Sequence, residues 1–145
     1  MRRTYPSRPV VGVGAVVVDR GRVVLVKRRH APLAGRWSLP GGVLELGETL
    51  EGGIAREVLE ETGLVVDVGP LVGVVDRIVL DDVRRIRYHF VLVDYLCRPS
   101  GGALRSGSDA SDAILVDPCE LAPYDLPREA SDMVARAVTM EGDRP

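Results

Sequence analysis

Residues 39–64 constrain this chain most, because they place a glycine pair before a short and strongly acidic helical stretch. Thr49 suits the N-cap position, since its hydroxyl can accept a backbone N–H of the first turn. Gly63 is the expected stop, because glycine adopts the left-handed conformation that follows a last helical turn. The sequence therefore predicts a glycine turn at residues 40–42 and a helix from Thr49 to about Glu61.

Three glutamates share one face of this helix. Glu57, Glu60 and Glu61 stand at positions i, i+3 and i+4, which a turn of about 100° per residue brings to the same side. Like charges at this spacing destabilise a helix by a few tenths of a kcal/mol per pair, roughly. Arg56 can reach Glu60, but one guanidinium does not neutralise three carboxylates. A hard divalent cation such as Mg²⁺ takes oxygen ligands and pairs with phosphate-bearing substrates; the alternative is a solvated acidic face.

A longer pattern surrounds the acidic face. It consists of Gly42, five residues, Glu48, seven residues and the run Arg-Glu-Val-Leu-Glu-Glu-Thr-Gly-Leu at positions 56–64. This pattern resembles the Nudix box, the signature of the Nudix hydrolase family, at every specified position. One departure is the pair Gly52-Gly53 inside the helix, where each glycine costs roughly 1 kcal/mol relative to alanine. Close packing of the helix on a sheet is the favoured explanation.

The resemblance implies hydrolysis of a nucleoside diphosphate linked to another moiety, with Mg²⁺ as the cofactor and Mn²⁺ as its substitute. It assigns the metal ligands to Glu57, Glu60, Glu61 and the main-chain carbonyl of Gly41. Arg56 would orient a box carboxylate rather than touch the substrate. Glu60 or Glu61 would activate the attacking water, unless a carboxylate outside the box does so.

Two further acids are candidates for the general base or an additional metal ligand. Asp109 and, after it, Asp112 lie in a late Ser/Asp-rich loop, although such loops are mostly solvated turns. Glu48 lies at the junction of loop and helix. It either holds a metal-bound water or braces Arg56, and the sequence does not separate these roles.

Candidates for substrate binding are arginines and the single tryptophan. Arg28 and Arg87 suit bidentate phosphate recognition, as do Arg77 and Arg85, and an exposed surface arginine is the ordinary alternative for each. Trp37 could stack on a base. A lone tryptophan beside a glycine turn is more often a packing residue, and packing is the favoured interpretation.

The composition excludes several other classes. A chain of 145 residues with 46% hydrophobic and 28% charged residues is one ordinary globular domain. The net charge of −2 provides no field that recruits a nucleic acid polymer or an anionic membrane. No run approaches the roughly 18 apolar residues of a membrane span. Cys97 and Cys119 are expected to be idle thiols. We therefore expect a cytoplasmic protein whose partner is a small-molecule nucleotide, with a homodimer left open.

The order of elements predicts the fold class. Expected strands cover residues 10–18, 23–27, 64–76 with a break at Gly69-Pro70, 85–97 and 114–116, and a final helix covers residues 127–140. Strands and helices that interleave in this way indicate an α/β protein. The resemblance implies a Nudix-type α/β/α sandwich with a mixed central sheet and the box as loop–helix–loop. We expect a single domain over residues 1–145, with a loose N-terminal arm at 1–9 and a loose tail at 141–145.

Three functions remain open at this point. Residues 87–94 and 109–116 resemble small bacterial Nudix proteins grouped with ADP-ribose pyrophosphatases, which favours ADP-ribose or a nucleotide sugar as the substrate. The alternative is a (d)NTP pyrophosphohydrolase of the antimutator type, because the box residues do not set substrate choice. A ligand-sensing domain with this fold is the third. It is disfavoured because such domains commonly lose box carboxylates and this chain keeps all three.

Overall fold

The valine-rich run near the N-terminus forms the central strand of a mixed sheet, because β-branched side chains favour the extended backbone. This strand, β1 (Val10–Asp19), pairs in parallel with β6 (Ile86–Gly102) and in antiparallel with β2 (Arg22–Arg28) and β4 (Gly41–Val43). The computed structural model describes residues 3–29, 34–105 and 110–143. Within them the sheet has seven strands, and the main path runs β3-β2-β1-β6-β5.

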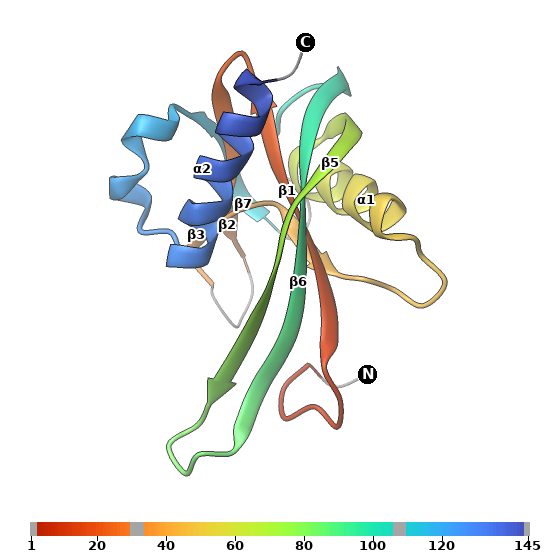
Figure 1. Ribbon diagram of the computed structural model, residues 1–145, viewed down its shortest axis with the longest axis vertical. Helices are drawn as coiled ribbons and strands as arrows, with labels where there is room; N and C mark the ends of the chain where they lie inside the picture. Colours follow the sequence, from red (N-terminus) through yellow and green to blue (C-terminus); the bar gives the residue numbers. More distant parts are fainter. Residues whose placement is uncertain (1–2, 30–33, 106–109, 144–145) are drawn as a thin grey trace.

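The remaining elements complete the sheet and cover it (Figure 1). The strands are β3 (Trp37–Ser38), β5 (Leu64–Leu80) and β7 (Ala110–Val116); the helices are α1 (Leu50–Thr62), α2 (Arg128–Gly142) and the 3₁₀ turns η1 (Pro118–Glu120) and η2 (Ala122–Tyr124). β7 pairs with β2, and β5 pairs with β6 along nearly its whole length. Among the described residues no helix is long and apolar enough to cross a membrane.

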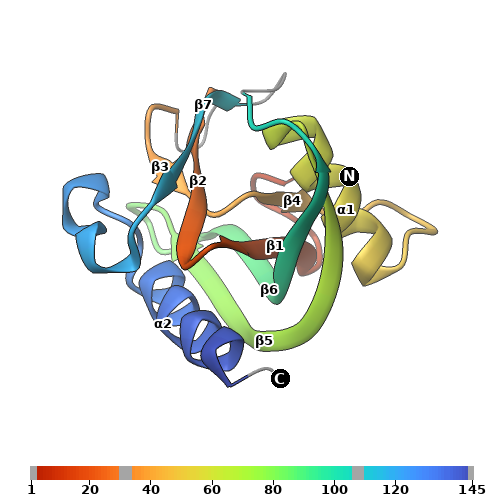
Figure 2. The same cartoon turned by 90° about the horizontal axis from the view of Figure 1, so that it is seen from above.

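The two helices lie on opposite faces of the sheet, as Figure 2 shows. Successive side chains of a strand point to opposite faces, and β1 supplies both cores in this way. One core joins Val13, Ala15 and Val17 to side chains of α1, and the other joins Val16 and Val18 to side chains of α2. The predicted α/β sandwich with a mixed central sheet is therefore confirmed.

Helix α1 begins and ends where the sequence predicts, within one residue. The Thr49 hydroxyl accepts the Gly52 N–H at 3.0 Å, and Gly63 ends the helix with φ of 75°. An added Cβ at Gly53 would lie 2.8 Å from Leu44 Cδ1, so close packing explains this glycine. The same explanation is wrong for Gly52, which is exposed; an added Cβ there would lie 3.0 Å from the Thr49 hydroxyl.

Three local predictions were wrong. The Gly41-Gly42 pair lies in β4 rather than in a turn, because it pairs with β1. The strand expected over residues 64–76 continues to Leu80 as β5, and the break expected at Gly69-Pro70 takes the form of a register shift between Val68 and Leu71 within it. The strand expected over residues 85–97 also continues further, as β6, to Gly102.

Described residues in the terminal segments that we expected to be loose make specific contacts. The Tyr5 N–H donates to the Arg87 carbonyl at 2.8 Å, and the Tyr5 hydroxyl donates to Asp81 at 2.9 Å. At the other end α2 extends to Gly142, and the Glu141 carboxylate accepts from Arg98 Nε at 2.7 Å. Cys97 and Cys119 are both free thiols.

Candidate active site

The packing of α1 decides which carboxylates face the protein. Ile54 and Val58 are buried against β1, and the same side of the helix carries Glu57 and Glu61 inward. The exposed fractions of these two glutamates are only 9% and 3%, whereas Glu60 is exposed. Carboxylates are buried at a cost unless polar groups meet them, and those groups come from Arg56 and from β4.

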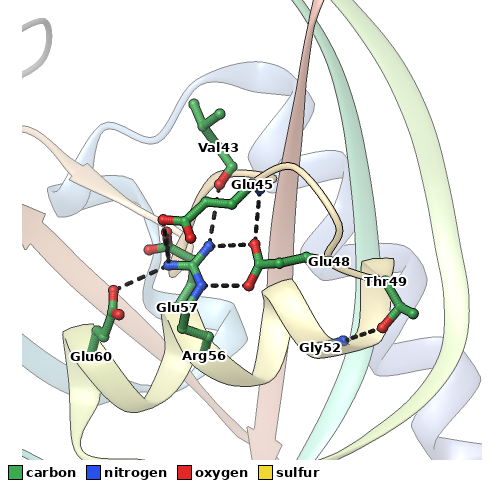
Figure 3. Close-up of polar contacts among 8 residues, drawn as sticks. All are labelled: Val43, Glu45, Glu48, Thr49, Gly52, Arg56, Glu57 and Glu60. Carbon is green, nitrogen blue, oxygen red and sulfur yellow. Dashed lines mark hydrogen bonds and ion pairs between the residues drawn. The ribbon is translucent and has the colours of Figure 1, made fainter. Parts of the chain in front are cut away.

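Arg56 lies at the centre of the acidic cluster (Figure 3). Its Nε and Nη2 donate to the two oxygens of Glu48 at 2.6 and 2.8 Å, a bidentate pair of the strongest kind. Its Nη1 donates to Glu57 at 2.9 Å and to Glu60 at 3.3 Å, and its Nη2 also reaches the Val43 carbonyl at 3.3 Å. One guanidinium thus orients three carboxylates.

These contacts keep the arginine and its main partner ionised. The hydrogen bonds from Arg56 and from the Glu45 N–H lower the pKa of Glu48 to about 2. Hydrogen bonding to Glu48, and then to Glu57, raises the pKa of Arg56. Of the two roles left open for Glu48, the structure supports the bracing of Arg56.

The two glycines of β4 lie directly against the buried carboxylates. The Gly41 N–H donates to Glu61 Oε1 at 2.7 Å. An added Cβ at Gly42 would overlap the carboxylate of Glu57, and one at Gly41 would overlap the Val13 carbonyl oxygen. Only glycine permits this approach of strand and helix, which explains the glycine pair ahead of the acidic run.

The donor chemistry of this cluster fits a hard divalent cation. Among the described residues no three His, Cys, Asp or Glu side chains converge as a ready metal site; Glu57 and Glu60 turn toward Arg56, and Glu61 turns toward the Gly41 N–H. Glu57 and Glu60 each use one oxygen toward Arg56, while the bidentate bond of that arginine goes to Glu48. The ligands on offer are all oxygens, which is what Mg²⁺ requires.

A pocket of about 420 Å³ adjoins the glycine strand near the start of α2. Gly41 and Gly42 belong to its lining, so the same two residues border both the carboxylates and the pocket. One wall consists of alternate β6 side chains: Tyr88, Phe90, Leu92 and Asp94. The volume falls within the usual range of small-molecule sites.

The pocket holds charged groups of both signs. Arg77 of β5 and Glu129 of α2 form an ion pair across it at 2.6 Å. The Nε of Arg28 is buried and has no hydrogen-bond partner among the described residues. Burial raises the pKa of the Asp94 carboxyl to about 6.

The structure brings only part of the predicted substrate set together. Arg28 and Arg77 line the pocket. Trp37 instead packs edge-on against Tyr124, with ring centroids 5.3 Å apart, as the favoured packing interpretation expected. Arg87 lies nearer the tip of the β5–β6 hairpin, with its guanidinium 5.6 Å from the Tyr88 ring, and does not line this pocket.

Of the two late acids, only Asp112 lies in the part of the chain that the structure describes. Asp109 lies outside the residues that the structure describes. Asp112 is exposed on β7 opposite Lys27, and its Oδ1 accepts the Ala113 N–H at 2.9 Å.

Sequence reasoning missed Asp94 and Glu129 as pocket residues. The place of Asp94 could have been predicted, because it follows Tyr88, Phe90 and Leu92 at every second position of the same strand. It is the one acid of that series. Glu129 carried none, since its place depends on how α2 meets the sheet.

The fold and the cluster together define an α/β protein whose acidic helix face and glycine strand suit chemistry with cations and phosphates. The chain belongs to the NUDIX family: the model of the NUDIX domain matches residues 8–137. The family identification from the box is therefore confirmed.

Relatives within the family carry two kinds of name. An ADP-ribose pyrophosphatase of Methanocaldococcus jannaschii is 36% identical over 109 residues, covering 75% of this chain and 62% of that protein. A putative 8-oxo-dGTP diphosphatase 2 of Mycobacterium tuberculosis is 46% identical over 87 residues, covering 57% of this chain and 59% of that protein. The chain thus spans less than two thirds of the length of either relative.

A solved structure supports the fold over a larger share of its chain. The MutT NUDIX hydrolase from Burkholderia pseudomallei superimposes with a TM-score of 0.76 at 32% sequence identity. The match covers 90% of this chain and 98% of that one. The names of the relatives do not separate an ADP-ribose substrate from an oxidised nucleotide.

Proposed function

We propose that this protein is a Mg²⁺-dependent hydrolase of phosphoric anhydride bonds, acting on a nucleoside diphosphate linked to another moiety. One observation carries the proposal: the glycine strand that contacts the buried carboxylates of α1 also borders a pocket of about 420 Å³. A substrate can therefore place its diphosphate at the acidic face and its remaining moiety in the pocket.

The residues of α1 and β4 divide the work. Glu57, Glu60, Glu61 and the Gly41 carbonyl hold the divalent cation, Mg²⁺ or Mn²⁺. When bound, this cation neutralises charge on the phosphoryl oxygens and lowers the pKa of water. Arg56 orients Glu57 and Glu60 through the hydrogen bonds described above and stays away from the substrate.

Glu60 is the proposed acceptor of the proton from the attacking water. Its side chain is 43% exposed, and its contact with Arg56 is the longest of the hydrogen bonds that this arginine makes to carboxylates. Glu61, by contrast, is buried and accepts from the Gly41 N–H. Asp109 remains a candidate for the same task on its sequence position alone.

ADP-ribose or a nucleotide sugar is the favoured substrate, supported by the name of the Methanocaldococcus relative. The name of the Mycobacterium relative supports the alternative, a (d)NTP pyrophosphohydrolase that removes oxidised nucleotides. A ligand-sensing role is disfavoured, because the chain retains all three glutamates and holds each of them by a hydrogen bond: Glu57 and Glu60 to Arg56, and Glu61 to the Gly41 N–H.

The test is a substrate panel with the purified chain in Mg²⁺ and in excess chelator. The panel comprises ADP-ribose, nucleotide sugars, and canonical and oxidised dNTPs, with phosphate release measured after a coupled phosphatase. Glu61→Gln removes a proposed ligand. Glu51→Gln is the matched control, because Glu51 is an exposed acid of the same helix outside the cluster.

We expect one substrate class to turn over in Mg²⁺, with the activity lost in chelator and in Glu61→Gln but kept in Glu51→Gln. Turnover that persists both in excess chelator and in Glu61→Gln would contradict the proposed role of a metal ion. A chain that binds these nucleotides and hydrolyses none of them would favour the sensing role.

A further inference from the structure

The N-terminal arm that precedes β1 borders two cavities, and it lies beside the β5–β6 hairpin (Figure 1). Arg3 and Thr4 belong to the lining of the pocket of about 420 Å³ beside the glycine strand. The next residue, Tyr5, lines a separate cavity of about 380 Å³ at the tip of the hairpin. Because these residues are consecutive, whatever fixes Tyr5 also limits where Arg3 and Thr4 can lie.

Three contacts fix Tyr5 to the hairpin. Its N–H donates to the Arg87 carbonyl at 2.8 Å, and its hydroxyl donates to Asp81 Oδ2 at 2.9 Å. The Arg85 guanidinium lies 4.9 Å from the centroid of the Tyr5 ring, which is a cation–π contact. The backbone, the hydroxyl and the ring of this residue are therefore all held by one hairpin that lies far along the chain.

The acceptor of the Tyr5 hydroxyl is itself fixed within the hairpin turn. Asp81 Oδ1 accepts the N–H groups of Val83 and Arg85 at 3.0 and 2.8 Å, and Oδ2 accepts from Arg85 Nε at 2.9 Å. Burial acts to raise the pKa of Asp81, but the hydrogen bonds of the turn and of Tyr5 outweigh it and lower that pKa to about 2. The carboxylate is therefore ionised at neutral pH and accepts from Tyr5 in a fixed position.

The backbone of Tyr5 adopts a conformation that is unfavourable for its residue type. Its φ is 50°, in the left-handed region that residues other than glycine rarely occupy. Such a conformation persists only where the surrounding structure holds it, and residues of this kind cluster at ligand-binding and active sites. The contacts with the hairpin hold Tyr5 in this way, and the two residues before it border a pocket.

Arg3 has hydrogen-bond donors left for a ligand. Its side chain makes no hydrogen bond or ion pair within the part of the chain that the structure describes. A guanidinium carries five N–H donors and binds phosphate oxygens well. The arm thus adds an unpaired cation to the lining of a pocket whose proposed ligand, a nucleotide, is an anion.

We propose that Tyr5 is a positioning residue, which anchors the N-terminal arm to the β5–β6 hairpin so that Arg3 lies at the pocket and contacts the bound nucleotide. The inference rests on the proposed function for the identity of the ligand. Tyr5 acts through the arm, because its own side chain lines the other cavity. Its effect is therefore on nucleotide binding and not on the hydrolytic step, whose proposed metal ligands lie on α1 and β4.

The experiment first measures binding, so that it does not depend on hydrolysis. Calorimetry in Mg²⁺ gives the dissociation constants of AMP and GMP for the wild-type chain, Tyr5→Ala, Arg3→Ala and the double variant. Arg8→Ala is the matched control, because Arg8 is an exposed arginine of the same arm that lines neither cavity. Urea denaturation measures the stability of each chain separately. Steady-state kinetics then give kcat and KM of the same chains for whichever substrate of the panel turns over.

We expect Tyr5→Ala and Arg3→Ala each to raise the dissociation constant by about fivefold, the change that a typical net hydrogen-bond contribution produces. The double variant should bind no more weakly than either single variant, because Tyr5 acts through the arm that carries Arg3. Arg8→Ala should bind as the wild-type chain does. In turnover, KM should rise by the same ratio while kcat stays within about twofold.

Tyr5→Phe keeps the ring that Arg85 contacts and removes only the hydroxyl that donates to Asp81. It should raise the dissociation constant less than Tyr5→Ala does, and it tests the same anchor if Tyr5→Ala does not fold. Unchanged binding in both Tyr5 variants would overturn the inference, even with lowered stability, because Tyr5 would then be a structural residue only.

Two other results would also overturn the inference: additive effects of Tyr5→Ala and Arg3→Ala, and a wild-type chain that binds neither nucleotide. A failure of the proposed function gives a different result. A chain that hydrolyses its substrate in Mg²⁺ but shows no effect of Tyr5 on binding keeps the function and loses the inference. A chain that shows the coupling between Tyr5 and Arg3 but hydrolyses nothing keeps the inference and loses the function.

Discussion

The acidic cluster on α1 and the pocket beside β4 are neighbours that satisfy their polar groups in opposite ways. In the cluster, Arg56 donates to Glu48, Glu57 and Glu60, and the Gly41 N–H donates to Glu61. In the pocket, the Arg28 Nε has no partner among the described residues, and the Asp94 carboxyl has a raised pKa. In the first site protein groups hold the carboxylates, whereas in the second a buried guanidinium nitrogen is left without a partner in the described part of the chain.

This difference indicates a division between chemistry and specificity. A network that holds its carboxylates in place keeps the ligands of a cation ordered before any substrate arrives. A pocket with unpaired groups, in contrast, stays energetically unfavourable until a ligand supplies the missing hydrogen bonds. We therefore expect changes in the cluster to affect every substrate alike, and changes in the pocket to affect the choice among substrates.

The largest expected effect comes from Glu57→Gln, which removes a buried carboxylate that Arg56 holds. Loss of a group that merely supports a metal ligand costs about 10–100-fold, so the loss of a ligand should lower kcat by more than about 100-fold. The fold should persist, since glutamine still accepts from Arg56 and one like charge on α1 is removed.

Hydrolysis rates and circular dichroism of this variant check the prediction, with Glu51→Gln as the control. Normal turnover by Glu57→Gln would show that the cluster is a structural feature only. A reduction confined to one substrate of the panel would show that Glu57 contributes to substrate choice. That result would contradict the proposed division, in which the cluster supplies chemistry and the pocket supplies specificity.

Arg56→Lys tests how strongly Arg56 holds the cluster together. Lysine keeps the positive charge but cannot make the bidentate bond to Glu48. Because Arg56 is partly buried and bonded to several charged groups, the free energy of unfolding should fall by about 2 kcal/mol. Urea denaturation measures the change. Arg36→Lys, at an exposed ion pair of 3.3 Å with Asp125, should change it by less than about 0.5 kcal/mol.

The same variant has a defined pH dependence. The pKa of Glu48 is lowered to about 2 in the folded state, so its contribution to stability is present above the ordinary glutamate value and is lost as the pH falls toward 2. The wild-type chain should therefore lose its advantage over Arg56→Lys between about pH 4 and pH 2. A constant advantage across that window would contradict the role of the ion pair.

The cluster was largely predictable from sequence, and the pocket was not. The helix, its caps and the shared face of Glu57, Glu60 and Glu61 follow from spacing within a few turns of one element, where local rules are sufficient. The contact of Glu57 with Gly42 depends on the pairing of β4 with β1, which the expected glycine turn did not anticipate.

The lining of the pocket comes from six strands, β1 to β6, and from the start of α2, so no single segment carries its signature. The far end of β5 was missed for a related reason: the strand expected over residues 64–76 continues to Leu80 because its pairing with β6 continues, and the Gly69-Pro70 step becomes a register shift within it. Long-range pairing overrides a local signal wherever the partner strand is long enough to continue past it.

Asp94→Asn tests the pocket instead of the cluster. It should raise the free energy of unfolding, whereas Arg56→Lys should lower it, and the change should be smaller. Below about pH 4 the carboxyl is protonated in both the folded and the unfolded state, and its burial costs nothing extra. As the pH rises through 4 toward 6, the unfolded state releases its proton first, so unfolding becomes more favourable. Above pH 6 the penalty is constant, about 1–2 kcal/mol after allowance for partial exposure.

Asparagine carries no charge to bury, so this variant should be more stable than the wild-type chain at pH 8 by that amount and equal to it at pH 4. Thermal or urea denaturation at the two values measures the difference. Asp76→Asn, at an exposed position of β5, serves as the control and should give the same small change at both. A pH-independent gain for Asp94→Asn would mean that packing, rather than the buried charge, sets the effect.

The smallest expected effect concerns the scaffold that the cluster depends on. Thr49→Ala removes the acceptor for the Gly52 N–H at the start of α1 and should lower the free energy of unfolding by about 1 kcal/mol. Thr49→Ser keeps the acceptor and is the matched control. Because Glu57, Glu60 and Glu61 lie two or more turns away on α1, kcat at a temperature well below the unfolding transition should stay within about twofold of wild type. A large loss of kcat in Thr49→Ala but not in Thr49→Ser would contradict this expectation. It would show that the cluster depends on the N-terminal turn of α1 and not only on Arg56 and β4.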